Sequence, residues 1–246
     1  MINDIFVIMW KEARETFALR STLRGGWIGL LVFIIVFGVF MPLQSGPQWI
    51  ESPGTILVWA WVPFILINSI VADSFAGERE RRTLETMLAS RLSDRAILFG
   101  KIAAAIAYGW GLTLVSVLLA LLTINIAFGQ GKMLVFTRLF GFAVLALSFL
   151  VSSMAVGLGV LVSLRATTVR QAYQTLSFAF LFFFIPLFLF PFLPAEWQQK
   201  AMHFFSQLDL ASLLWIAGAN LLTINVALLL LCIKRFDRRR LILDQS

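Results

Sequence analysis

The residues with the most chemical potential lie in one charged segment, residues 73–95, where ten of twenty-three side chains carry charge. Glu78 precedes Arg82 by four residues. Arg81 precedes Glu85 by the same spacing. Acids and bases four residues apart are neighbours on a helix and attract each other. The chemistry that this spacing predicts is ionic recognition, of a neighbouring helix or of a partner, rather than catalysis.

The same segment predicts a short amphipathic helix over Gly77–Ser90, because Leu84, Met87 and Leu88 form an apolar patch at helical spacing. Ser93 is a suitable N-cap for the helix that follows. A solvated loop whose charges only fix membrane topology is the alternative, but arginines alone would serve that purpose. The interleaved acids and the apolar patch favour a helix that docks on a protein partner.

Catalytic motifs are absent from the sequence. No G-x-x-x-x-G-K-[ST] loop, H-E-x-x-H motif or G-x-S-x-G elbow occurs. Cys232 is the only cysteine and His203 the only histidine, which excludes an intrachain disulfide and a Cys/His metal cluster. We therefore expect no catalysis, metal or cofactor in this chain, and any ATP energy must come from another polypeptide.

The composition places these residues in a membrane protein. Of 246 residues, 60% are hydrophobic and 13% charged, whereas soluble domains are about 25% charged. We predict a single transmembrane domain over residues 1–246. The net charge is +7, and the basic residues that produce it lie beside apolar segments. This placement favours a role in membrane topology and argues against nucleic-acid binding.

Six apolar runs are close to or above the about 20 residues that a helix needs to cross a bilayer. They lack the alternation of barrel strands, so we predict an all-α integral membrane protein with six transmembrane helices. Pro63 interrupts the second run. The runs are Trp27–Leu43, Thr55–Ala72, Ile97–Phe128, Leu139–Leu164, Tyr173–Leu193 and Leu210–Ile233.

Basic residues predict the orientation of these spans. Seventeen of the twenty Lys and Arg residues lie in segments 1–26, 73–101, 165–172 and 234–246, and three lie in the opposite loops. Because basic loops stay on the cytoplasmic side, both termini and the charged segment are predicted to be cytoplasmic.

The first 24 residues are predicted to contain an amphipathic helix in the cytoplasmic interface, with Trp10 near the lipid headgroups. A frayed cytosolic tail is the alternative. Asp73, at a membrane edge, is expected to cap or anchor a helix rather than relay protons. The apolar face of the interfacial helix consists of Ile2, Ile5, Phe6, Met9, Ala13 and Phe17.

Interhelical hydrogen bonds explain the scattered polar residues of the spans most simply. A weakly polar translocation pathway is the alternative, and the candidates for lining it are Asn68, Thr113, Ser116, Ser152 and Asn220. Three small-x-x-x-small pairs would allow helices to approach each other closely. These are Gly25 with Gly29, Ala105 with Gly109, and Ser153 with Gly157.

The stretch Phe75–Lys101 resembles the characteristic segment of permeases of the type-2 ABC exporter family. The family pattern has a Glu-rich start, then Thr-Leu-Glu-x-Leu-Leu, a Pro-Val-Ser or Pro-Leu-Ser turn, and Gly-Lys in the third helix. Proline is usual where this sequence has Arg91, and leucine is common at Met87. The matching positions are Glu78, Glu80, Thr83, Leu84, Glu85, Leu88, Ser93, Gly100 and Lys101.

The resemblance implies the architecture of a permease subunit. It implies an N-terminal interfacial helix over residues 1–24, a cytoplasmic coupling helix in 74–95 and an extracellular helical insertion over 194–209, between spans five and six. Such a chain lies in the plasma membrane of a bacterium or archaeon. It pairs there with an identical or related second permease subunit.

The resemblance also implies a cytosolic ATP-binding subunit, which binds the ATP and magnesium, as the partner of the coupling helix. Arg165 and Arg170, in the second cytosolic loop, are weaker candidates for the same contact. Two rivals remain open: a non-transporting scaffold that recruits a cytosolic ATPase, and an ion-gradient-driven carrier, which the scarcity of charge within the spans disfavours. The implied docking residues are Glu78, Arg81, Thr83, Leu84, Glu85 and Leu88.

Overall fold

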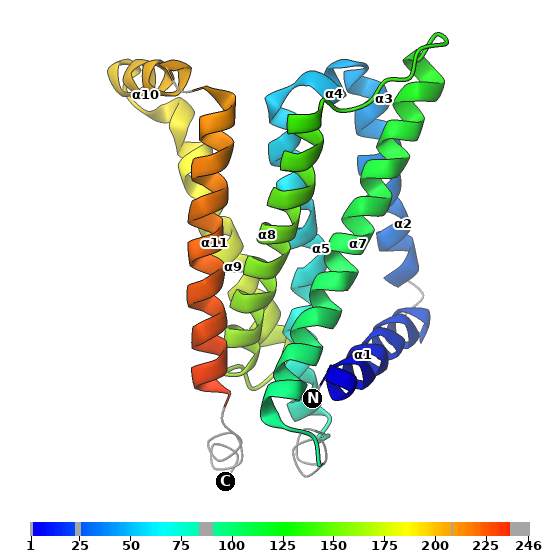
Figure 1. Cartoon of the computed structure of the whole chain (residues 1–246). Helices are drawn as coiled ribbons and strands as arrows, with labels where there is room; N and C mark the ends of the chain where they lie inside the picture. Colours follow the sequence, from blue (N-terminus) through cyan, green and yellow to red (C-terminus); the bar gives the residue numbers. More distant parts are fainter. Residues whose placement is uncertain (1, 23–25, 84–90, 208, 237–246) are drawn as a thin grey trace.

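The computed structural model describes residues 2–22, 26–83, 91–207 and 209–236, and within them every regular element is a helix (Figure 1). The elements are α1 (Ile2–Thr22), α2 (Gly26–Ile35), the π-helix η1 (Val36–Phe40), α3 (Met41–Ser45), α4 (Gln48–Glu51), α5 (Pro53–Glu80), α7 (Asp94–Phe128), α8 (Arg138–Ser163), α9 (Val169–Leu189), the 3-10 helix η2 (Phe190–Phe192), α10 (Ala195–Gln207) and α11 (Leu210–Arg235).

Five helical stretches of the described chain are long and apolar enough to span a membrane. They are Trp27–Ser45, formed by α2, η1 and α3 together, and the helices α5, α7, α8 and α11. The five do not include α9, which covers most of the fifth predicted span. The count of six spans therefore stays a prediction.

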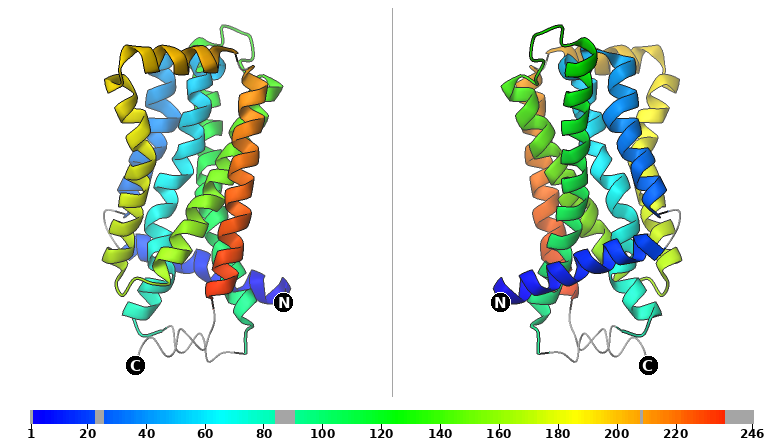
Figure 2. Two further views of the ribbon diagram at one scale, coloured as in Figure 1. Left: turned by 90° about the vertical axis from the view of Figure 1, so that its left-hand side faces the viewer. Right: turned by 90° about the vertical axis from the view of Figure 1, so that its right-hand side faces the viewer.

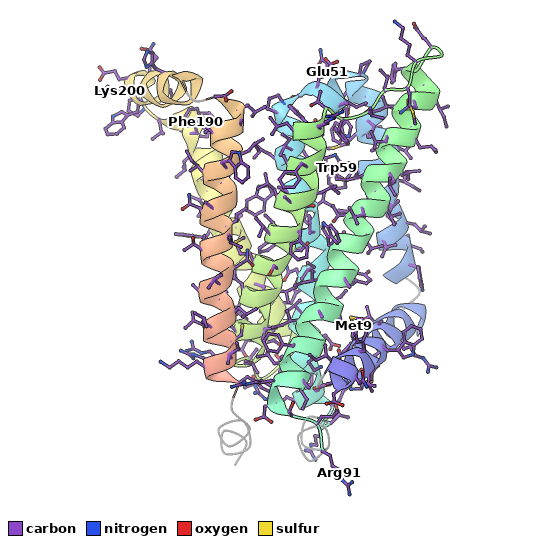
Figure 3. The ribbon with its side chains drawn as sticks, viewed as in Figure 1. Met9, Glu51, Trp59, Arg91, Phe190 and Lys200 are labelled. Atoms are coloured by element: carbon purple, nitrogen blue, oxygen red, sulfur yellow. The ribbon has the colours of Figure 1, made fainter. Side chains whose placement is uncertain are left out.

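Helix α5 lies at the centre of the bundle and contacts α7, α8 and α9. It begins where Ser52 Oγ accepts a hydrogen bond from Gly54 N, with Pro53 at the first helical position. The helix continues through Pro63, so the proline does not interrupt the second span. Trp59 and Phe75 are fully enclosed by the neighbouring helices, and Figure 3 shows Trp59 directed into the bundle.

Small residues bring these helices close together. A Cβ atom at Gly109 of α7 would lie 2.2 Å from Ile67 of α5, and one at Gly157 of α8 would lie 3.1 Å from Leu228 of α11. Two of the three predicted small-residue pairs thus pack inside the chain. Gly29, from the third pair, has open space where its side chain would be.

Short helices lie across the two ends of the bundle (Figures 1 and 2). Helix α1 crosses the end that carries the last turn of α5 and the first turn of α7, which we call the α1 end, and α10 lies at the opposite end. In α1, Ile8 packs on α7, whereas Phe6 and Trp10 are exposed. The apolar side chains of α1 therefore occupy two faces, one on the bundle and one outside, rather than the single predicted face.

Candidate functional site

The candidate site is the connection between α5 and α7, residues 81–93, together with the helix ends that carry it. Helix α5 extends through Glu80, beyond the predicted start of a separate helix at Gly77. It ends in a Schellman turn, in which Thr83 N donates to Glu78 O at 2.9 Å and Arg82 N donates to Arg79 O at 3.0 Å. Arg82 has a φ of 58°, the left-handed conformation that this turn requires.

This turn changes the role of Glu78. The predicted pairing of Glu78 with Arg82 along one helix is wrong, because Arg82 lies beyond the end of α5 and the Glu78 carboxylate faces the interior. Glu78 Oε1 instead accepts a hydrogen bond from Lys101 Nζ of α7 at 3.0 Å. Lys101 also donates to Glu12 Oε1 of α1 at 2.7 Å. The three side chains, which we call the charge centre, join α1, α5 and α7.

Lys101 is the most enclosed member of the charge centre, since its side chain is only 1% exposed. Its third hydrogen bond goes to Ser74 O at 2.9 Å, so all three ammonium donors are used. The Phe75 ring lies 5.2 Å from Nζ. A buried cation needs this degree of compensation, because an uncompensated buried charge costs several kcal/mol, roughly 3–5 when one partner of a pair is removed.

Lys11 adds a second cation at the edge of the charge centre, 3.5 Å from Glu78 Oε1 and 3.4 Å from Glu15. Burial lowers the pKa of Lys11, but the neighbouring carboxylates of Glu78, Glu12 and Glu15 raise it by more, so the net shift is upward. Lys11 therefore stays protonated at neutral pH.

The two residues after Glu78 bind different elements. The two terminal guanidinium nitrogens of Arg79 donate to the chain just after α8, Nη2 to Leu164 O and Nη1 to Ala166 O. Glu80 Oε2 accepts from Val169 N, the first residue of α9, at 3.1 Å. Three consecutive residues at the end of α5 thus bond to α1, α7, the α8–α9 loop and α9.

Ser163 of α8 joins the backbone of α5 one turn before this end. Its hydroxyl oxygen accepts from Phe75 N at 3.1 Å and Ala76 N at 2.9 Å, and the hydroxyl donates to Ala72 O at 3.1 Å. A foreign hydroxyl inserted among the helical hydrogen bonds weakens the regular ladder of α5 and favours bending there. The position is fully buried.

The predicted docking residues occupy different environments. Arg81 pairs with Asp73 at 3.0 Å, so Asp73 anchors the turn at the end of its own helix. Thr83 is exposed, and Glu78 is buried. Arg91 projects from the α1 end (Figure 3), and Ser93 Oγ caps α7 by accepting from Ala96 N at 3.2 Å. The remaining docking candidates, Leu84, Glu85 and Leu88, lie outside the described residues.

The predicted pathway residues do not form one surface within this chain. Thr113, Ser116 and Ser152 are buried between helices. Asn68 donates to Ser177 Oγ of α9 at 3.2 Å, whereas Asn220 is exposed on α11. Interhelical and within-helix hydrogen bonds account for most of these side chains, and a role in translocation stays a prediction for each.

Sequence reasoning did not identify the charge centre. Lys101 was matched only as part of a family pattern, and Glu12 was not singled out. One sequence feature could have found the lysine: it lies two turns inside the helix that Ser93 caps, and thirty uncharged residues follow it. An ionisable residue in that position needs a partner, and only the fold shows which carboxylates provide it.

Comparison with known proteins gives a family. The family model described as ABC-2 family transporter protein matches residues 57–240. A comparison with curated proteins finds no match. The matched range contains most of α5, the α5–α7 connection and the helices from α7 to α11, and it begins after α4.

Proposed function

Since the chain belongs to the ABC-2 family of transporter proteins, whose members are non-catalytic membrane components of transporters, we propose that it is the permease subunit of an ATP-binding-cassette exporter. In this proposal the α1 end faces the cytoplasm, as the basic residues predict. A separate subunit binds and hydrolyses ATP, and a second permease subunit, identical or related, completes the membrane part.

The α5–α7 connection is the proposed docking segment for the ATP-binding subunit. It lies within the family match and follows a helix end that is bonded to several elements. A push on the connection would reach α1 and α7 through Glu78, the α8–α9 loop through Arg79, and α9 through Glu80. The position of these three consecutive residues, directly before the proposed docking segment, is the observation that carries the proposal.

A photocrosslinking experiment tests the docking. A photoreactive amino acid replaces Thr83, which is an exposed residue of the connection. In a control variant it replaces Met133, which is 85% exposed in the loop between α7 and α8. We expect the Thr83 variant, but not the Met133 variant, to crosslink in native membranes to a protein with ATP-binding motifs. Mass spectrometry identifies the product.

A paired substitution tests whether the contact matters. Leu84→Asp places a charge on the predicted apolar patch, and Met133→Asp makes the same kind of change in the opposite loop. We expect Leu84→Asp to remove ATPase activity from the purified complex and Met133→Asp to retain it. If the wild-type chain purifies without any ATPase, the exporter proposal fails and a carrier independent of ATP takes its place.

Transport itself separates an exporter from a scaffold. Vesicles reconstituted with both subunits provide this test. An exporter is expected to hydrolyse ATP faster when a transported compound is present and to accumulate that compound across the bilayer. A stable complex that hydrolyses ATP but moves none of a broad panel of amphipathic compounds would favour the scaffold.

A further inference from the structure

A cavity separate from the charge centre opens at the α1 end between α8, α9 and α11. Its volume is about 390 Å³, within the range of about 300–1,000 Å³ typical of small-molecule sites. Part of its wall is apolar, formed by Leu161, Val162 and Leu231. Two arginines, Arg165 and Arg235, line the same cavity.

The cavity has an apolar part and a cationic part in a fixed order. Helices α8 and α11 both run toward the α1 end (Figure 1). Leu161 precedes Arg165 by four residues, and Leu231 precedes Arg235 by four. One helical turn rises about 5.4 Å, so Leu231 lies about one turn deeper in α11 than Arg235. Leu161 lies inside the last turn of α8, and Arg165 follows the end of that helix.

The two arginines form no salt bridge with a carboxylate of the described residues; the salt bridges at this end of the bundle hold Lys11, Arg81 and Lys101 instead. The backbone around Arg165 is held in place, because Arg79 bonds to the carbonyl oxygens of Leu164 and Ala166 on either side. Two guanidinium groups on one cavity repel each other unless an anion lies between them. Arginine is the side chain best suited to a phosphate, which it can bind through two parallel hydrogen bonds.

The cavity also lies at the depth of lipid headgroups if the apolar helices span the bilayer. The ends of α8 and α11 reach the level of α1 (Figure 1), and α1 exposes Phe6 and Trp10, residues typical of the membrane interface. Beyond α11 the sequence continues with three consecutive arginines, residues 238–240. Clusters of basic residues directly after a membrane helix attract anionic lipids.

We propose that this cavity binds an anionic phospholipid of the leaflet that contacts the α1 end. The phosphate lies between Arg165 and Arg235, and one acyl chain extends along the deeper apolar wall of Leu161 and Leu231. The site rests on the cavity, its charges and its depth in the bilayer, and it is independent of the proposed exporter activity.

A binding measurement on the purified chain tests the site without any ATP-binding subunit. The chain in mild detergent is titrated with short-chain phosphatidylglycerol, with phosphatidylcholine of equal chain length, and with glycerol 3-phosphate, and native mass spectrometry gives the bound fraction. We expect phosphatidylglycerol to bind at least tenfold more tightly than the other two compounds, and this preference to weaken as the salt concentration rises. Equal binding of phosphatidylcholine overturns the proposal. Equal binding of glycerol 3-phosphate shows a soluble-phosphate site and overturns the lipid assignment.

Substitutions locate the binding in the cavity. The variants Arg165→Gln and Arg235→Gln are each expected to weaken phosphatidylglycerol binding about tenfold, because each removes charge-assisted hydrogen bonds to the phosphate. The matched controls are Arg170→Gln, exposed at the same end, and Arg138→Gln, exposed at the opposite end of α8. If the controls weaken binding as much as the cavity variants, attraction is general and the site is refuted. Because the comparison of phosphatidylglycerol with phosphatidylcholine uses the wild-type chain, it tests the anionic preference even where a variant does not fold.

Discussion

At the scale of single residues, Lys101 shows how an apolar bundle accommodates a cation. The ammonium group bonds to two carboxylates and one carbonyl, from helices that are distant in sequence. Buried ion pairs contribute little net stability when complete, but removal of one partner leaves the others uncompensated. The charge centre thus contributes little net stability. The helices α1, α5 and α7 must nevertheless assemble so that all three charged side chains meet.

Lys101→Met is predicted to destabilise the chain strongly. The substitution keeps the length of the side chain but leaves Glu78, only 6% exposed at its side chain, without its nearest cation. We expect a loss of about 3–5 kcal/mol in the free energy of unfolding, measured by denaturation in detergent. Lys132→Met, in an exposed loop, is the control and should change little. The double variant Lys101→Met/Glu78→Gln should recover part of the loss, and no recovery would contradict the pairing.

The stabilising effect of Lys11 is predicted to disappear only at alkaline pH. Burial lowers its pKa, but three carboxylates raise it by more, so the pKa lies above the ordinary value of 10.5. A raised pKa means that the folded state holds the proton more tightly than the unfolded state, so the stabilisation is complete below pH 10.5 and is lost above it. The effect is small because the side chain is half-exposed. Lys11→Gln should have a lower melting temperature than the wild type at pH 7–9, and this difference should shrink above pH 10.5. A difference that grows there would contradict the assignment.

At the scale of helices, most boundaries could be predicted from the sequence because apolar runs and caps define them locally. The predicted spans over residues 97–128, 139–164 and 210–233 differ from α7, α8 and α11 by at most three residues at either end. Ser93 caps α7 as its position predicts. The end of α5 could not be predicted, because the second apolar run ends at Ala72 and the charged residues after it indicate a separate helix from Gly77. Residues 73–80 remain helical because their partners come from α1, α7 and the α8–α9 loop, which no local pattern shows.

The packing of α1 on α7 is predicted to depend on Gly100. An added Cβ there would lie 2.7 Å from Ile8 Cβ, so α1 would have to move away. Gly100→Ala should therefore lower the melting temperature and speed proteolysis within α1. Gly111→Ala, on the same helix but with open space around it, should be neutral or gain up to about 1 kcal/mol from helix propensity. The double variant Gly100→Ala/Ile8→Ala should restore part of the packing, and equal effects of the two alanines would contradict this account.

The hydroxyl of Ser163 is predicted to stabilise the contact between α8 and α5. Ser163→Ala removes the acceptor of Phe75 N and Ala76 N and should cost about 1–3 kcal/mol in the free energy of unfolding. Ser152→Ala on the same helix is the control, because its buried hydroxyl has no hydrogen-bond partner within the described residues. That control should be neutral or stabilising. Thermal unfolding of both variants in one detergent measures the difference, and an equal cost would show that the contact with α5 is irrelevant.

At the scale of the whole molecule, the bonds at the end of α5 connect this helix to α1, α7, the α8–α9 loop and α9. Glu78, Arg79 and Glu80 face three directions, and each is held by a different element. Packing then extends this connection along α5, which contacts α7, α8 and α9. We therefore expect a displacement applied at residues 81–93 to reach these elements, as the proposed function requires.

Removal of one of these bonds is predicted to reduce the response at the opposite end. Spin labels at Met133 and Lys200, both exposed there, report the distance between the α7–α8 loop and α10 in the complex with the proposed ATP-binding subunit. We expect ATP to change this distance in the wild type and to change it less in Arg79→Gln, although docking persists. Arg14→Gln, an exposed position on α1 for which the structure shows no bond to α5, is the control. An unaltered response in Arg79→Gln would show that the push travels by another route.

The charge centre also has a consequence for biosynthesis. Ribosomes make the chain from its N-terminus, so Glu12 and Glu78 are already synthesised when Lys101 leaves the exit tunnel. A lysine without a counter-ion costs about 2.5–3.5 kcal/mol at the centre of an inserting helix, and less near the end of the helix, where Lys101 lies. Here the two carboxylates are synthesised before the lysine, so the helix that carries Lys101 can enter the bilayer next to Glu12 and Glu78. The order of the residues along the chain thus favours correct insertion, an advantage that the finished structure alone would not require.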